Sequence, residues 1–214
     1  MTHAFDKDYW DQHWQQRHGD SPAARAGKPP NPYLTRETGE LAVGSALDAG
    51  CGVGTEAIWL AARGWRVTAV DIAPEALALA AEHAATSAPA GNVRWIEADL
   101  TAWEPEARFD LVTTHYAHPA MPQLAFYDRV SAWVAPGGTL LIVGHLHAPG
   151  HLHAPAAGEH GHHPPAEASV TLADITAGLD HTRWEINTAE EHVRTIPGRP
   201  VPLHDVVVRA TRRA

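Results

Sequence analysis

The residues best suited to ligand chemistry lie in one run, Leu47-Asp48-Ala49-Gly50-Cys51-Gly52-Val53-Gly54-Thr55-Glu56. Glycines that follow a strand allow a tight turn and let the backbone approach a ligand closely. A helix that begins after them presents free N–H groups, which favour an anionic group of a ligand. Asp71 ends the next predicted strand, 21 residues after Gly50. An acid at that place can accept hydrogen bonds from ribose hydroxyls, so the run predicts a ligand site rather than a plain turn.

Strands that alternate with helices must position these groups. Apolar runs predict strands at 46–49, 66–70, 93–96, 109–113 and 139–143, and helices at 55–63, from residue 74 onward and at 121–134. This alternation predicts right-handed crossovers and a parallel sheet that helices cover on both faces. Ligands bind at the carboxyl ends of the strands in such a sheet. Four candidate residues fall at those ends: Gly50, Asp71, Asp99 and His115.

The flanking segments are less regular. Trp10, His13, Trp14 and Arg17 recur at helical spacing, whereas residues 19–32 are rich in glycine and proline and predict a loop. Pro136-Gly137-Gly138 predicts a turn before the fifth strand. A short helix at 171–179 and strands at 183–188 and 203–209 follow, and the two strands predict a hairpin at the sheet edge.

The spacing of the glycines distinguishes two kinds of cofactor. A dinucleotide-binding turn follows the pattern G-x-G-x-x-G. Here Thr55 stands at the third glycine position, and Gly54 comes one residue early. A nucleotide-dependent oxidoreductase is therefore an alternative that Thr55 disfavours.

The composition excludes several classes of protein. The chain has 214 residues and a single cysteine, so we expect one domain without a disulfide framework. A net charge of −9 argues against nucleic acid as the main partner. No apolar run is long enough to span a membrane, and the N-terminal residues lack the pattern of a signal peptide. These features predict a cytoplasmic protein that does not associate with membranes.

Histidines gather after the fifth predicted strand, where residues 145–168 form a low-complexity loop of His, Ala, Pro and Gly. Two interpretations stay open, a solvated insertion or a metal site, because neutral imidazoles are good ligands for zinc, nickel or copper. The candidate ligands are His145, His147, His151 and His153. No acid or cysteine pattern fixes a coordination geometry.

The run LDAGCGVG, followed by VDIAPEAL, ADL and APGGTLLIV, resembles the class I S-adenosylmethionine-dependent methyltransferases over about residues 40–144. It is similar to the small bacterial tellurite-resistance and thiopurine methyltransferase group, and the segments YWDQHW and NPYL add to this resemblance. The resemblance implies an α/β, Rossmann-like three-layer sandwich with a seven-stranded, mostly parallel sheet and an antiparallel last strand. It implies a single methyltransferase domain over 1–214, with an N-terminal lid and loop (1–40), a cofactor-binding core (41–144), the His-rich loop (145–168) and C-terminal edge strands (169–214).

The resemblance also implies roles for individual residues. Asp48 and the loop of Gly50, Cys51, Gly52 and Gly54 would hold the methionine part of the cofactor. Asp71 would bind the ribose hydroxyls, Ile72 would pack on the adenine, and Asp99 and Leu100 would meet the adenine edge. Thr114 to Tyr116 would lie beside the transferable methyl. The aromatic residues Tyr9, Trp10 and Trp14 would form a lid over the substrate; packing of the N-terminal helix onto the sheet is the alternative interpretation of the same residues.

The predicted function is transfer of a methyl group from S-adenosylmethionine to a small-molecule acceptor. If the acceptor must lose a proton, His115 or His118 is the candidate base, next to Tyr116, because histidine titrates near neutral pH. A soft anionic nucleophile would need no base, and Cys51 is interpreted as a small filler in the loop. A metal-binding or sensor protein that uses the His-rich loop is a further alternative. The acceptor atom, whether oxygen, nitrogen, sulfur or a metalloid, and the oligomeric state stay open.

Overall fold

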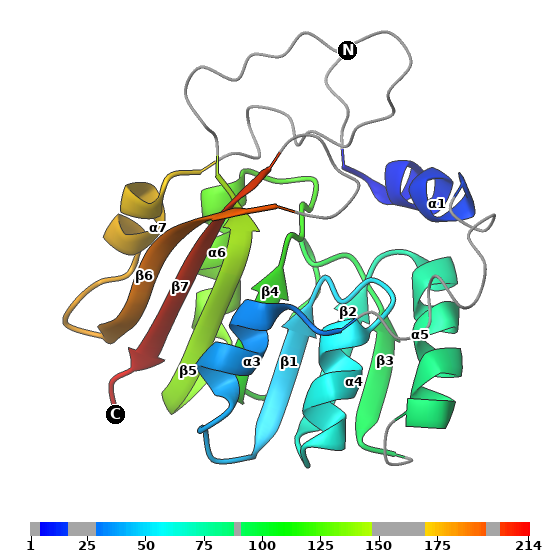
Figure 1. The fold of residues 1–214 in the computed structure, drawn as a ribbon, viewed down its shortest axis with the longest axis horizontal. Helices are drawn as coiled ribbons and strands as arrows, with labels where there is room; N and C mark the ends of the chain where they lie inside the picture. The colour runs from blue at the N-terminus through cyan, green and yellow to red at the C-terminus, as the bar shows by residue number, and fades with distance from the viewer. Residues whose placement is uncertain (1–4, 17–28, 88–90, 147–169, 196–201) are drawn as a thin grey trace, which may run out of the picture.

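The computed structural model describes residues 5–16, 29–87, 91–146, 170–195 and 202–214 (Figure 1). The helices are α1 (Lys7–Gln16), α3 (Pro32–Thr38), α4 (Thr55–Ala62), α5 (Pro74–Ser87), α6 (Gln123–Ala132) and α7 (Leu172–Gly178). The strands are β1 (Ser45–Ala49), β2 (Arg66–Asp71), β3 (Val93–Glu97), β4 (Phe109–His115), β5 (Val134–His145), β6 (Trp184–Arg194) and β7 (Leu203–Arg212).

The strands form one seven-stranded sheet in the order β3-β2-β1-β4-β5-β7-β6. The pairs among β1 to β5 are parallel, and β7 runs antiparallel to both of its neighbours, β5 and β6. The predicted sheet, with its antiparallel last strand, is therefore confirmed. The predicted C-terminal hairpin is also present, with β6 at the edge of the sheet and β7 inserted beside β5.

Helices cover both faces of the sheet, as the apolar strands predict. On one face, α3, α4 and α5 contribute the buried side chains of Leu34, Leu60 and Leu77. On the other face, Phe126 of α6 and Ile175 of α7 lie in the second apolar cluster. Figure 1 shows α3 and α4 in front of the sheet and α6 behind it. The central strands are buried on both sides, which fixes their carboxyl ends as a rigid platform.

Residues 32–38, most of which carry no sequence-based prediction, form α3; Asn31 caps this helix by accepting a hydrogen bond from the Tyr33 amide, and Pro32 occupies its first turn. Most of the loop predicted at 19–32 lies outside the described residues. One local feature differs from the sequence-based expectation. The predicted turn at 136–138 lies inside β5, at an irregularity in its pairing with β4. Between two paired positions, β4 advances by two residues, from Phe109 to Leu111, while β5 advances by five, from Val134 to Thr139. The described connection between β3 and β4, residues 98–108, contains no helix. Among the described helices, none is both long and apolar enough to cross a membrane.

Candidate active site

A cavity of about 240 Å³ opens at the carboxyl ends of β1, β2, β3 and β4, under α1. Many of the residues singled out by the sequence line it: Trp10, Trp14, Asp48, Gly50, Cys51, Gly52, Asp71, Ile72, Asp99, Leu100, His115, Tyr116 and His118. Three others, Tyr9, Gly54 and Thr114, lie outside this lining. The topology therefore brings most of the predicted site residues together at one end of the sheet.

The glycine loop after β1 is held against the end of β2. The amides of Gly50 and Cys51 both donate to the Val70 carbonyl, at 2.9 and 3.1 Å. The Gly52 amide donates to one oxygen of Asp71 at 2.7 Å, and the Ala73 amide donates to the other at 3.0 Å. Asp71 is thus fixed in place by backbone donors, while each carboxylate oxygen keeps lone-pair capacity for a ligand.

Close approach explains why the loop carries glycine. A Cβ at Gly50, whose φ is 80°, would collide with the Cβ of Ala117. A Cβ at Gly52 would lie 3.3 Å from the indole ring of Trp14. Gly54 serves packing, because a Cβ there would meet the Trp95 ring at 2.5 Å. Glycine therefore leaves room for Ala117 and Trp14 beside Gly50 and Gly52, which line the cavity, and for Trp95 beside Gly54.

Buried carboxyl groups give the cavity an acidic side. Asp48 is 1 % exposed, and its Oδ2 has no hydrogen-bond partner. Burial raises the pKa of Asp48 well above its ordinary value, and the nearby carboxylates of Glu56 and Asp71 raise it further. Burial also raises the pKa of Asp71, against the lowering effect of its backbone hydrogen bonds. An orphaned buried carboxyl among other acids is suited to a cationic ligand group.

We expect Asp48→Asn to stabilise the ligand-free protein more strongly at high pH than at low pH. Because the pKa of Asp48 is higher in the folded state, the folded chain binds more protons there, and stability falls as pH rises above the pKa of the unfolded carboxyl. The amide has no such penalty. The melting temperature of the variant relative to wild type should therefore rise from about pH 5 to about pH 8. An equal difference at both pH values would contradict this account of Asp48.

Helix α1 covers the cavity and is fixed at two points. The Trp10 Nε1 donates to the carbonyl of His118 at 3.3 Å. The Lys7 ammonium donates to the Ile72 carbonyl at 3.1 Å and to Glu97 at 2.9 Å. Tyr9 contacts the rings of Phe5 and Trp10, with centroid distances of 5.1 Å each, and so supports the covering residues from outside the cavity.

The two candidate bases differ in how they are held. The Gln123 amide nitrogen donates to the Ala117 carbonyl at 3.0 Å, which leaves its oxygen to accept from Nδ1 of His118 at 3.1 Å. This arrangement assigns the proton to Nδ1 and the free lone pair to Nε2 of His118. His115 Nδ1 lies 3.3 Å from the Thr113 hydroxyl, and its buried Nε2 has no partner. Burial lowers the pKa of both histidines, so both rings are uncharged at neutral pH.

The Tyr116 hydroxyl is engaged by polar groups from distant parts of the chain. It accepts hydrogen bonds from Arg194 Nη2 at 2.9 Å and from Asn31 at 3.4 Å. Arg194 Nε in turn donates to Asp205 at 2.9 Å, and Asp205 is fully buried. Burial raises the pKa of Tyr116, so its hydroxyl stays protonated and cannot act as a base at neutral pH. Tyr116 is also the one described non-glycine residue with positive φ, at 54°.

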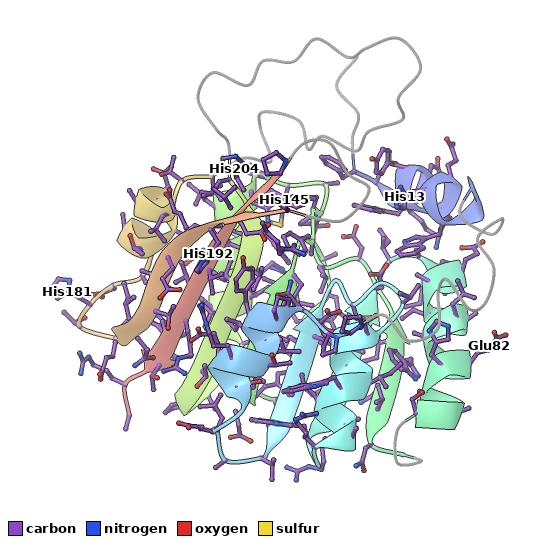
Figure 2. The ribbon with its side chains drawn as sticks, viewed as in Figure 1. His13, Glu82, His145, His181, His192 and His204 are labelled. Carbon is purple, nitrogen blue, oxygen red and sulfur yellow. The ribbon has the colours of Figure 1, made fainter. Side chains whose placement is uncertain are left out.

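Of the four histidines predicted as candidate metal ligands, one, His145, lies among the described residues. His145, which is labelled in Figure 2, stacks on Tyr116 with a centroid distance of 4.3 Å, and its Nδ1 lies 3.7 Å from Asp205. His147, His151 and His153 lie outside the described residues. The described part of the chain contains no group of three or more His, Cys, Asp or Glu side chains that could hold a metal ion.

Some lining residues have no place in the sequence-based prediction of the site: Phe5, Ala98, Ala117, Pro119 and Ala120. Three more, Val53, Thr55 and Glu56, belong to the predicted glycine run but had no role of their own. Some had a local signal. Thr55 and Glu56 begin the helix after the glycine loop, and Phe5 stands four residues before Tyr9 at helical spacing. Ala117, Pro119 and Ala120 follow β4, so their position depends on how that strand ends.

The chain resembles known methyltransferases in sequence and in fold. Residues 46–138 match the family described as "Methyltransferase domain". Trans-aconitate 2-methyltransferase from Streptomyces avermitilis is 36% identical over 115 residues, which cover 51% of this chain and 40% of that protein. The chain thus spans less than half the length of this curated relative.

Solved structures share the fold at low identity. TehB from Haemophilus influenzae has a TM-score of 0.67 and 15% identity, covering 86% of this chain and 62% of that one. The 1,6-didemethyltoxoflavin-N1-methyltransferase from Burkholderia thailandensis has a TM-score of 0.65 and 19% identity, covering 97% and 87%. The latter structure holds 1,6-didemethyltoxoflavin and S-adenosylhomocysteine.

Proposed function

We propose that this chain, whose residues 46–138 match a methyltransferase domain and whose strands form one seven-stranded sheet, transfers a methyl group from S-adenosylmethionine to a small-molecule acceptor. The observation that carries the proposal is the junction of the glycine loop with Asp71, where the Gly52 amide binds the carboxylate beside the cavity. The sequence and fold matches favour this function over the oxidoreductase and metal-sensor alternatives. The composition supports a cytoplasmic location as part of the same proposal.

The cavity fits this cofactor chemically. S-Adenosylmethionine has a positive sulfonium, an amino acid part and a ribose with two hydroxyls. The orphaned buried carboxyl of Asp48 and the neighbouring Glu56 suit the cationic part. Asp71 would accept hydrogen bonds from the ribose, and Ile72 and Leu100 offer apolar surface to the adenine. Gly50 and Gly52 line the cavity without a side chain, so the amino acid part would approach their backbone closely.

The residues around the cavity would position the two substrates and exclude water. The cofactor supplies an activated methyl, so the chemistry that remains is to align a nucleophile with it. Trp10 and Trp14, from α1, line the cavity and would shield the bound cofactor from solvent. For an acceptor that must lose a proton, Nε2 of His118 is the favoured base, because Gln123 fixes the tautomer that leaves this nitrogen free.

We expect His118→Ala to lower turnover about 100-fold for an acceptor that requires deprotonation. The affinity for S-adenosylhomocysteine should change little, since the base acts on the acceptor. His181, which lies far from the cavity in the turn before β6, provides the matched control His181→Ala (Figure 2). The readout is transfer of a labelled methyl group from S-adenosylmethionine to a set of thiol, phenol and amine acceptors. A loss below about threefold for every acceptor would remove His118 as the base.

The same assay tests the proposed function itself. Methyl transfer to at least one acceptor, lost when the protein is omitted, would support it. Binding of S-adenosylhomocysteine without transfer to any acceptor would leave a cofactor-binding protein of the same fold, because a fold alone does not fix an activity.

A further inference from the structure

The cavity has two chemically different sides. Its acidic side lies at the ends of β1 to β3 and consists of Asp48, Glu56, Asp71 and Asp99. Its other side carries aromatic rings from the N-terminal segment and from the end of β4. We call this side the ring wall and define it as Phe5, Trp10, Tyr116 and His118. If the cofactor occupies the acidic side, as proposed above, the ring wall remains for the acceptor.

The rings of the wall contact one another across a long sequence separation. Phe5 stacks on Trp10 with a centroid distance of 5.9 Å and an interplanar angle of 25°. Phe5 also lies 5.6 Å from the ring of His118. The hydrogen bond from Trp10 Nε1 to the His118 carbonyl closes this arrangement. The N-terminal rings are therefore held directly against the segment that follows β4.

A second layer behind the wall fixes the orientation of its rings. The imidazole of His145 stacks on Tyr116 at 4.3 Å and lies 6.2 Å from His118, with interplanar angles of 25° and 22°. Arg194 and Asn31 hold the Tyr116 hydroxyl, and Gln123 holds the imidazole of His118. Rings that are fixed before a ligand arrives lose little entropy when it binds, which favours a flat ligand.

The charge of the cavity also favours an acceptor without a carboxylate. Among its described lining residues there is no lysine or arginine, while four carboxyl groups lie on the acidic side. Burial lowers the pKa of His118, so the wall itself is uncharged at neutral pH. Arg194 is nearby, but its Nε binds Asp205 and its Nη2 binds Tyr116. A carboxylate on the acceptor would therefore meet these acids with no lysine or arginine of the described lining to pair with.

We propose that the ring wall is the acceptor subsite and that it selects planar aromatic acceptors without a carboxylate. The inference deepens the proposed function and rests on it. It predicts that trans-aconitate, an aliphatic tricarboxylate, is not a substrate of this chain, although a similar relative is named for its methylation.

The test is calorimetric titration of acceptor mimics into the full chain saturated with S-adenosylhomocysteine. The probes are 2-naphthol, 2-naphthoate and trans-aconitate; the first two share the naphthalene ring and differ in carrying a hydroxyl or a carboxylate at the same position. We expect 2-naphthol to bind about tenfold or more tightly than 2-naphthoate, and trans-aconitate not to bind. Equal or tighter binding of either carboxylate, or no binding of 2-naphthol, would overturn the inference. If S-adenosylhomocysteine itself fails to bind in the first titration, the proposed function fails instead.

Variants locate the subsite. Phe5→Ala should weaken 2-naphthol binding about three- to tenfold, the loss expected for one aromatic contact. Val43→Ala removes two methyl groups from a side chain that is 59% exposed and outside the cavity lining, so it is the matched control. Affinity for S-adenosylhomocysteine, measured in the separate titration that saturates each variant beforehand, reports on folding of that variant. An unchanged 2-naphthol affinity in Phe5→Ala would overturn the assignment of the wall.

Discussion

Asp71→Ala is expected to weaken the binding of S-adenosylhomocysteine about a thousandfold. Two hydrogen bonds from ribose hydroxyls to an ionised carboxylate contribute about 2 kcal/mol each, which together corresponds to about three powers of ten. The substitution also releases the amides of Gly52 and Ala73, which the carboxylate now fixes at 2.7 and 3.0 Å. Cofactor contact and loop geometry are therefore lost together. Calorimetric titration of the variant measures the effect.

The control for this prediction is Asp180→Ala. Asp180 also accepts a backbone N–H, from Thr182 at 2.8 Å, but it lies in the turn before β6 and outside the cavity lining. It should leave the affinity unchanged. A loss below about tenfold in a folded Asp71→Ala variant would mean that the ribose is not held by this carboxylate.

Gly54→Ala is expected to destabilise the fold by about 3 kcal/mol, the sum of backbone strain and overpacking. The φ of Gly54 is 75°, and an added Cβ would meet the Trp95 ring at 2.5 Å and the Cβ of Ala80 at 2.9 Å. Gly91 isolates the backbone contribution, because its φ is 88° and nothing lies within 4 Å of the place for a Cβ.

Urea unfolding of both variants separates the two effects. Gly91→Ala should lose about 1 kcal/mol of unfolding free energy, and the remainder for Gly54→Ala measures the packing of α4 and α5 against β3. Equal losses in the two variants would contradict the role of Gly54 as a packing position.

The core of the fold could be predicted because its signals are local. Each parallel strand is a short apolar run, and the glycine loop and Asp71 stand at fixed distances along the sequence. The irregularity in β5 was not predictable in the same way, since Pro136-Gly137-Gly138 has the composition of a turn. Pairing with β4 at Val134 and again from Thr139, and with β7 from Thr139 onward, keeps both sides of these residues in the sheet, although Gly137 itself has a φ of 78°.

The polar support of the cavity could not be predicted, because its members are far apart in the sequence. Arg194 and Tyr116 are 78 residues apart, and Tyr33 and Asp205 are 172 apart. A single sequence contains no local pattern that pairs such residues. The two distinct sides of the cavity could not be predicted either, because they depend on the contact between α1 and the segment that follows β4.

The most direct test of the central claim is calorimetric titration of wild-type protein with S-adenosylmethionine and S-adenosylhomocysteine, with NADH as the competing cofactor. The account predicts that both sulfur compounds bind with dissociation constants of about 1–100 μM and that NADH does not bind. Binding of NADH, or no binding of either sulfur compound by folded protein, would contradict it.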